Sequence, residues 1–191
     1  MRTTLALLLL SACSSNNPAM DGGTDASSDV STDTSSSDSG SNCASASATV
    51  TGTIQAATLS AKDAVYAPPA NGGSAFAAIA DVANVCPIVK ANANKANAKV
   101  FVLVFTGGAP KVGMTPVGSM VLDAQWAAYD ATCSSMGGSA DSGSVTITRA
   151  DSCGVVGTFD LTFGNDHVTG SFTAPTCTIP PSDGGSTTCQ Q

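Results

Sequence analysis

Residues 144–173 read SVTITRADSCGVVGTFDLTFGNDHVTGSFT, and this stretch decides the fold class. In Ser144–Arg149 apolar and polar residues alternate, as they do in a β-strand with one buried face. The same alternation continues through 157–163 and 168–173. Asp151–Gly154 and Gly164–Asp166 carry the Gly, Asn, Asp and Ser residues that favour turns. The stretch therefore predicts a three-stranded antiparallel meander.

The register of the last hairpin follows from its loop. If residues 165–166 form that loop, Phe163 faces Val168 and Leu161 faces Gly170. The apolar positions of both strands then meet on one face, so this register is self-consistent.

More strands are predicted upstream, where β-branched and aromatic residues recur between turn residues. The predicted strands cover 49–54, 64–67, 74–80, 100–105, 120–122 and 126–132. The run 100–105 is apolar throughout, which is typical of a central strand covered on both faces. We expect an all-β fold, an antiparallel β-sandwich or barrel of about eight or nine strands. The segment Cys86–Ala98 is either the one helix of this fold or a long loop.

Composition restricts the class of protein further. Of the 191 residues only 11% are charged, all fourteen acidic residues are Asp, and the formal net charge is −7. A nucleic-acid binder needs clustered Lys and Arg, so no nucleic-acid partner is expected. The chain has no Glu and only five Lys and two Arg for helix surfaces, which also argues against a helical protein.

The N-terminus has the pattern of an export signal. Met1-Arg2 is positively charged, Leu5–Leu10 is apolar, and small residues precede Cys13, so residues 1–12 form a predicted signal peptide. Leu10-Ser11-Ala12-Cys13 resembles the lipobox of bacterial lipoproteins. That resemblance implies cleavage before Cys13, a diacylglycerol (palmitate-type) anchor on its thiol, and, with Ser14 following, the outer membrane. An ordinary signal peptide with a nearby cysteine is the alternative.

A low-complexity segment separates this signal from the rest of the chain. Residues 14–42 contain ten Ser and five Asp, with no aromatic residue, Lys or Arg. Such a composition cannot bury enough apolar surface to fold, so residues 13–42 are predicted to be a lipidated, disordered tether. All nine aromatic residues lie between Tyr66 and Phe172, which places the folded domain at 43–191.

Six cysteines remain in the domain: Cys43, Cys86, Cys133, Cys153, Cys177 and Cys189. An even number in an exported chain predicts three disulfides, and six cysteines allow fifteen connectivities. We expect Cys43 to pair near the C-terminus, joining the first strand to the last. No CxxC pair occurs and there is one His in the chain, so neither a metal site nor a redox motif is predicted.

Residues suited to catalysis are few. A Ser-His-Asp hydrolase would need His167, and its sequence neighbour Asp166 is one candidate to orient it. Glycoside hydrolysis would need two carboxylates, for which Asp123, Asp130 and Asp160 are the candidates within predicted strands. His167 is expected on an outward strand face beside a turn, where a solvated histidine is more common than a general base.

Other candidate binding features are equally sparse. Gly107-Gly108 and Gly137-Gly138 lack the Lys-Ser/Thr of a phosphate-binding loop, so no cofactor is predicted. Arg149 is either a strand-end residue that reaches solvent or a buried anion-binding charge. The odd spacing of Trp126 and Tyr129 places them on opposite faces of a strand, where one could offer an exposed ring to a glycan.

The combination of lipobox, Ser/Asp tether and cysteine-stapled domain resembles the small β-rich lipoproteins of Gram-negative envelopes. It implies a membrane-anchored surface or periplasmic lipoprotein. We expect a non-catalytic module that binds a protein, glycan or small ligand, or has a structural role. The alternative is a small envelope hydrolase that uses Asp residues or His167.

Overall fold

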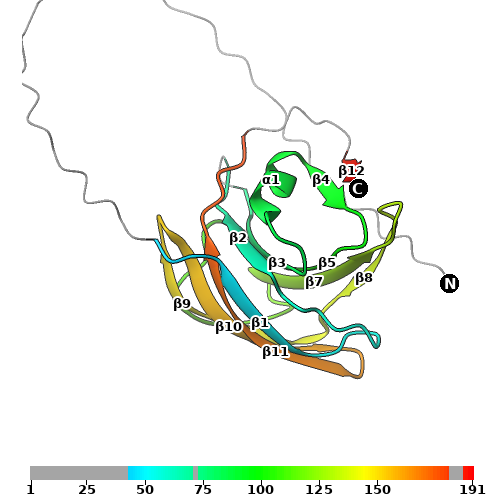
Figure 1. The fold of residues 1–191 in the computed structure, drawn as a ribbon. Helices are drawn as coiled ribbons and strands as arrows, with labels where there is room; N and C mark the ends of the chain where they lie inside the picture. Colours follow the sequence, from blue (N-terminus) through cyan, green and yellow to red (C-terminus); the bar gives the residue numbers. More distant parts are fainter. Residues whose placement is uncertain (1–42, 71–72, 181–186) are drawn as a thin grey trace, which may run out of the picture. The chain divides into compact units, whose positions relative to one another are not determined.

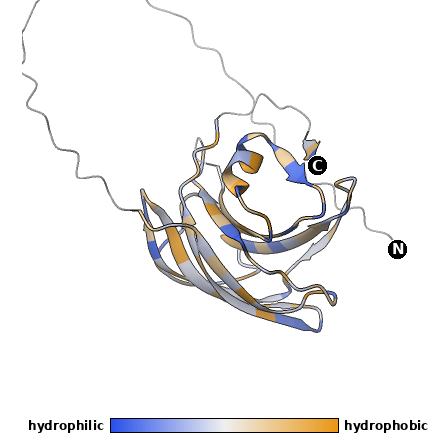
Figure 2. Cartoon of the chain, viewed as in Figure 1, coloured by the Kyte–Doolittle hydropathy of each residue, from blue (hydrophilic) through white to orange (hydrophobic). Residues whose placement is uncertain are grey.

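The protein folds into two facing five-stranded β-sheets (Figure 1). The computed structural model describes residues 43–70, 73–180 and 187–191, so the predicted signal peptide, Cys13 and the tether lie outside the described residues. Strands make up most of these residues, and of the two predicted architectures the arrangement is a sandwich. Hydrophobic and hydrophilic residues are mixed along the strands (Figure 2). The predicted all-β class is confirmed.

The first sheet has the strand order β1-β11-β10-β9-β6 and contains the predicted meander. Its strands are all antiparallel to their neighbours. They are β1 (Ser47–Gly52), β6 (Gly113–Pro116), β9 (Ser142–Asp151), β10 (Gly154–Phe163) and β11 (Asp166–Pro175).

The predicted register of the β10–β11 hairpin is wrong by two residues. Phe163 pairs with Asp166, so Gly164 and Asn165 form the loop and Phe159 faces Gly170. Gly164 has φ +62°, which suits the first position of a two-residue hairpin turn. A shift of two preserves the face of every side chain, so the buried positions are those expected.

The second sheet has the order β2-β3-β5-β7-β8. Its strands are β2 (Asp63–Ala67), β3 (Ala75–Ala80), β5 (Lys99–Phe105), β7 (Leu122–Tyr129) and β8 (Ser135–Ser139). β5 occupies the centre, as its apolar run predicts. The two strands predicted at 120–122 and 126–132 are one strand, β7, because residues 123–125 continue the pairing with β5.

Aromatic rings fill the space between the sheets. Phe101 of β5 stacks on Phe159 of β10 with ring centroids 5.1 Å apart, and meets Phe163 edge-on at 5.8 Å. Trp126 is also buried, with 4% of its surface exposed. The opposite face of β5 carries a smaller apolar cluster, to which Cys177 and Val85, the first residue of the short helix α1 (Val85–Lys90), contribute. This second cluster explains why the β5 sequence is apolar on both faces.

The segment 86–98, predicted as a helix or a loop, is divided between two short elements. Helix α1 (Val85–Lys90) is followed by β4 (Ala93–Lys95), which pairs in parallel with β12 (Thr188–Gln190). With β4, β6, β8 and β12 the described residues contain twelve strands, more than the eight or nine predicted. None of the described helices has the length and apolarity needed to span a membrane.

All six domain cysteines pair with one another, which confirms the predicted three disulfides. The pairs are Cys43–Cys153, Cys86–Cys177 and Cys133–Cys189. The expected bond from Cys43 to the C-terminus is wrong. Ser47 of β1 pairs with Thr173 near the end of β11, which places the preceding chain beside the β9–β10 turn that carries Cys153.

Candidate functional site

The only imidazole of the chain lies beside a carboxylate on the outer face of the first sheet. His167 Nε2 is 2.8 Å from Asp160 Oδ1. Asp160 of β10 faces Thr169 and His167 lies two residues earlier on β11, so the contact is a diagonal across the two strands. Both side chains are solvated, with 58% of His167 and 66% of Asp160 exposed.

This pair lacks the third member of a hydrolytic triad. The carboxylate that contacts His167 is Asp160, whereas the predicted candidate Asp166 accepts a hydrogen bond at its Oδ2 from the Gln55 backbone N–H at 2.7 Å. Hydroxyls are present on the same face, where the Thr49 and Ser171 side chains form a hydrogen bond with each other at 2.9 Å. Within the described residues, no hydrogen bond connects His167 to a serine hydroxyl. The geometry is that of a solvated His–Asp pair.

The carboxylates proposed for glycoside hydrolysis are separated by the fold. Asp160 projects from the outer face of the first sheet, whereas Asp123 lies on β7 of the second sheet and accepts a hydrogen bond from Gln125 Nε2. Asp130 follows β7 in a turn, where its Oδ1 accepts bonds from the Thr132 hydroxyl, the Thr132 N–H and the Ser134 N–H at 2.7, 2.8 and 3.0 Å. These donors, the Thr132 hydroxyl first, lower the pKa of Asp130. Its charge therefore stabilises a turn.

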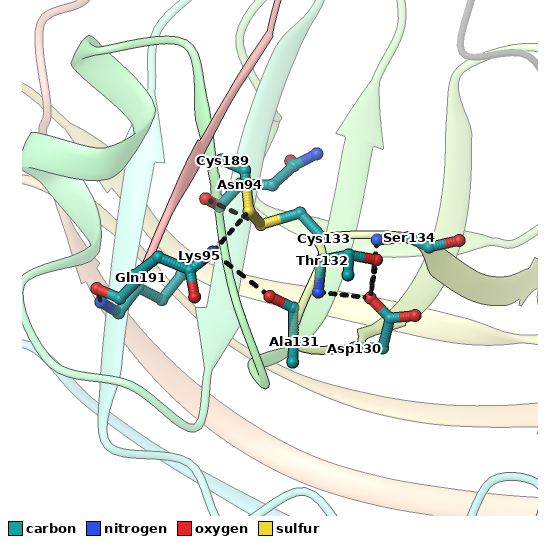
Figure 3. The surroundings of a disulfide bond; sticks show 9 residues. All are labelled: Asn94, Lys95, Asp130, Ala131, Thr132, Cys133, Ser134, Cys189 and Gln191. Atoms are coloured by element: carbon teal, nitrogen blue, oxygen red, sulfur yellow. Dashed lines mark hydrogen bonds between the residues drawn. A yellow bond between two sulfur atoms is a disulfide. The ribbon is translucent and has the colours of Figure 1, made fainter.

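The Asp130 turn leads directly to a disulfide (Figure 3). Cys133 has φ +59° and bonds to Cys189, so the short strand β12 is attached to the loop after β7. On the other side of this bond the Gln191 side-chain amide donates to the Ala131 carbonyl at 3.2 Å. The polar contacts around this disulfide hold the C-terminal strand in place.

Arg149 is a strand-end residue, the first of its two predicted alternatives. It lies next to a β-bulge in β9, where Arg149 pairs with Val156 but Ile147 pairs with Gly157, and its Nε is 3.4 Å from Asp151 Oδ2. Its side chain is 42% exposed, and its guanidinium faces a carboxylate two residues away. An anion-binding role would require that carboxylate to be displaced.

Two pockets among the described residues are respectively too small and too open to enclose a ligand. The slot between the sheets, lined by Phe101 and Trp126 among others, holds about 10 Å³, which is room for a single water. A wider depression of about 230 Å³ lies beside the Cys86–Cys177 disulfide. The one carboxylate there, Asp63, already accepts the N–H groups of Ala64 and Val85, each at 2.8 Å. Asp63 therefore fixes the start of α1.

The aromatic residues considered for glycan binding do not form an open platform. Trp126 belongs to the core, and Tyr129 is half-buried at the end of β7, where burial raises the pKa of its phenol. Within residues 43–70, 73–180 and 187–191, the large apolar side chains that are exposed are Val and Met. The sequence pattern predicts a strand at 120–122, which would contain Met120 and Val121, and it indicates no role for Val112, Met114 or Met136.

No cluster of three or more His, Cys, Asp or Glu side chains that could hold a metal ion occurs in the part of the chain that the structure describes. Comparisons with protein-family models, with curated proteins and with solved structures find no match to this chain.

Proposed function

We propose that the chain is a lipid-anchored protein of the bacterial envelope, whose disulfide-stapled sandwich is a non-catalytic binding or structural module. The lipobox assigns the anchor to Cys13, and Ser14 after it favours the outer membrane. A protein, a glycan or a small ligand in the envelope would be the partner of such a module.

The cysteine pairing is the observation that carries this proposal. The chain has seven cysteines, and the six in the domain pair with one another, so none of them is left to pair with Cys13. Three disulfides require an oxidising compartment, which an export signal provides. Lipid attachment needs a cysteine that lies outside these pairs and directly follows an apolar segment and a small residue. Cys13 has this position in the sequence. Acyl chains contribute about 0.8 kcal/mol per buried methylene, so several together anchor a protein stably.

Metabolic labelling tests the anchor. Cells that express the wild-type chain are grown with radiolabelled palmitate, next to cells that express Cys13→Ser and a Ser14→Ala control. We expect label and membrane association in the wild type and in Ser14→Ala, and loss of both in Cys13→Ser. Equal labelling of Cys13→Ser would refute the anchor at this residue.

The absence of a catalytic role is supported by the positions of the candidate residues. The carboxylates of Asp123 and Asp160 lie on different sheets, and the space between the sheets is filled by side chains. A domain of this kind is better suited to bind a partner on its surface than to enclose a substrate.

A small hydrolase is the second candidate function, because Asp160 and His167 are in hydrogen-bond contact. It is tested with the purified protein on a panel of ester and glycoside substrates, with Asp160→Asn and His167→Gln as variants. Hydrolysis that is present in the wild type and lost in both variants would establish the hydrolase and overturn the non-catalytic module. We expect no difference among the three proteins.

A further inference from the structure

The Cys133–Cys189 disulfide attaches the C-terminal strand β12 to the loop after β7 (Figure 3). β12 has three residues and pairs in parallel with β4, and these two strands form a sheet of their own. Next to this ladder the Ala96 N–H donates to the Gln190 carbonyl at 2.9 Å. Parallel pairing is slightly less stable per residue than antiparallel pairing, and an isolated pair of strands is at best marginally stable in water.

The segment 187–191 adds nothing to the hydrophobic core. None of its residues is a member of either apolar cluster of the described domain. Thr188 and Cys189 are exposed, and Gln191 makes a polar contact with the Ala131 carbonyl. Hydrogen bonds contribute little net free energy, because the same groups bond to water when they separate. The covalent bond is therefore what keeps β12 in place.

The turn that carries Cys133 is held without the help of the disulfide. The Cys133 N–H donates to the Asp130 carbonyl at 3.1 Å, and the Asp130 N–H donates to the Ser134 carbonyl at 2.9 Å. The Asp130 carboxylate adds the three bonds described above. If the bond between the sulfur atoms breaks, Cys133 stays in this turn, whereas Cys189 is free to leave with β12.

The other two disulfides join segments that are also held by their packing. Cys43 lies four residues before β1, whose six residues pair with β11. Cys177 is 2% exposed, and its N–H donates to the Tyr66 carbonyl at 2.7 Å. Such contacts keep the two thiols of a reduced pair close together, so their effective concentration stays high and the disulfide re-forms. β12 has no comparable support.

We propose that the Cys133–Cys189 disulfide is a redox-sensitive latch. A dithiol reductant opens it before the other two disulfides, and its opening releases residues 187–191 from β4 while the sandwich stays folded. The latch is closed in the oxidised protein, and it does not depend on the lipid anchor. Once it opens, the Ala96 N–H loses its acceptor, so the reduced protein differs from the oxidised one in an uncovered edge of β4.

The opening is a thiol–disulfide exchange in two steps. A thiolate of the dithiol attacks the sulfur of Cys189, the more exposed residue of the pair, and the bond to Cys133 breaks. Cys133 leaves as a thiolate and takes a proton. The second thiol of the reductant attacks the mixed disulfide, which releases Cys189 as a thiol and closes a disulfide within the reductant. The protein gains two electrons and two protons, and the dithiol loses them.

Graded reduction of the full chain tests the order of opening. The protein is purified in detergent, incubated under native conditions with rising concentrations of dithiothreitol, alkylated with N-ethylmaleimide and mapped by peptide mass spectrometry. We expect Cys133 and Cys189 to be alkylated at a dithiothreitol concentration about tenfold lower than the one that opens the other two disulfides. Alkylation of the other four cysteines at the same or a lower concentration would overturn the latch.

Hydrogen exchange at the Ala96 amide tests the release of β12. The oxidised wild type is compared with the wild type alkylated at Cys133 and Cys189 and with the variant Cys133→Ser with Cys189→Ser. In both open forms we expect Ala96 to exchange about tenfold faster than in the oxidised protein, whereas Leu103 in the central strand β5 keeps its protection. Unchanged protection of Ala96 would show that β12 stays docked without the bond, and loss of protection at Leu103 would show that the sandwich unfolds. Either result refutes the latch.

A matched control removes a different disulfide. In Cys43→Ser with Cys153→Ser the bond to β12 is intact, so Ala96 should exchange as slowly as in the oxidised wild type. If Ala96 loses protection in this variant to the same extent as in the open forms, its exposure is not specific to the Cys133–Cys189 bond, and the proposal is wrong.

Discussion

Gly170 on β11 leaves the space in which an aromatic ring of the core lies. A Cβ atom at this position would be 2.2 Å from the Thr49 carbonyl oxygen and 2.3 Å from Cζ of Phe159. Non-bonded carbon contacts are normally about 3.5–4.0 Å, so in Gly170→Ala both the Thr49 carbonyl of β1 and the Phe159 ring must move away, the ring by about 1 Å or more. The ring cannot retreat freely, because Phe101 stacks on it from the other sheet.

The expected cost of Gly170→Ala follows from this geometry. Overpacking a core costs about 1–3 kcal/mol, and here two groups resist displacement, so we expect the upper end, about 3 kcal/mol. The lower chain entropy of alanine in the unfolded state offsets about 0.4–1 kcal/mol of this. For a domain of this size, a net loss of about 2 kcal/mol lowers the melting temperature by roughly 4–8 °C.

Thermal unfolding followed by circular dichroism measures the effect, with Gly138→Ala as the matched control. Gly138 also lies in a strand, and a Cβ there meets nothing within 4 Å. That variant should stay within about 0.5 kcal/mol of the wild type. If both variants have the same stability, the close packing of Phe159 against Gly170 is not a property of the folded protein.

Three further predictions follow from single contacts. Ala56→Gly should raise the free energy of unfolding, measured by urea titration, by about 0.5–1 kcal/mol, because alanine at φ +62° is strained. A lower free energy of unfolding in the variant would contradict strain at this residue. The pKa of Asp130, followed by NMR, should lie below 3.8 and should rise in Thr132→Ala, which removes the hydroxyl donor; an unchanged pKa would refute that hydrogen bond. Because the pKa is lowered in the folded state, the contribution of Asp130 to stability is present above about pH 4 and is lost as the pH falls through the lowered pKa. Replacing Cys86 and Cys177 together by alanine should cost about 2–5 kcal/mol in the same titrations, since Cys177 is buried in the second apolar cluster; an unaltered midpoint would contradict that role.

Alternation of apolar residues predicts which faces of the strands are buried, but it does not determine the exact register. A hairpin shifted by two residues has the same buried face, so the loop at Gly164-Asn165 and the predicted loop one residue later are equally consistent with the pattern. This shift decides the candidate site. In the predicted register Asp160 would face Ser171, four residues from His167, whereas in the observed one it faces Thr169 and reaches His167 diagonally.

The short strands show a second limit of sequence patterns. β4 and β12 have three residues each and β6 has four, which is too few for periodicity to be recognised. They are fixed by pairing with distant segments, and in β12 by the Cys133–Cys189 bond. For the same reason the disulfide connectivity depends on the topology of the sheets.

Intact mass of the mature protein, extracted from membranes, tests the central claim most directly. We predict a chain that begins at Cys13 and carries glycerol-linked acyl chains. It should take up no alkylating reagent under denaturing conditions, and six alkyl groups only after reduction. A mass that retains residues 1–12, lacks acyl chains, or shows alkylation before reduction would contradict the account of a lipid-anchored, fully disulfide-bonded envelope module.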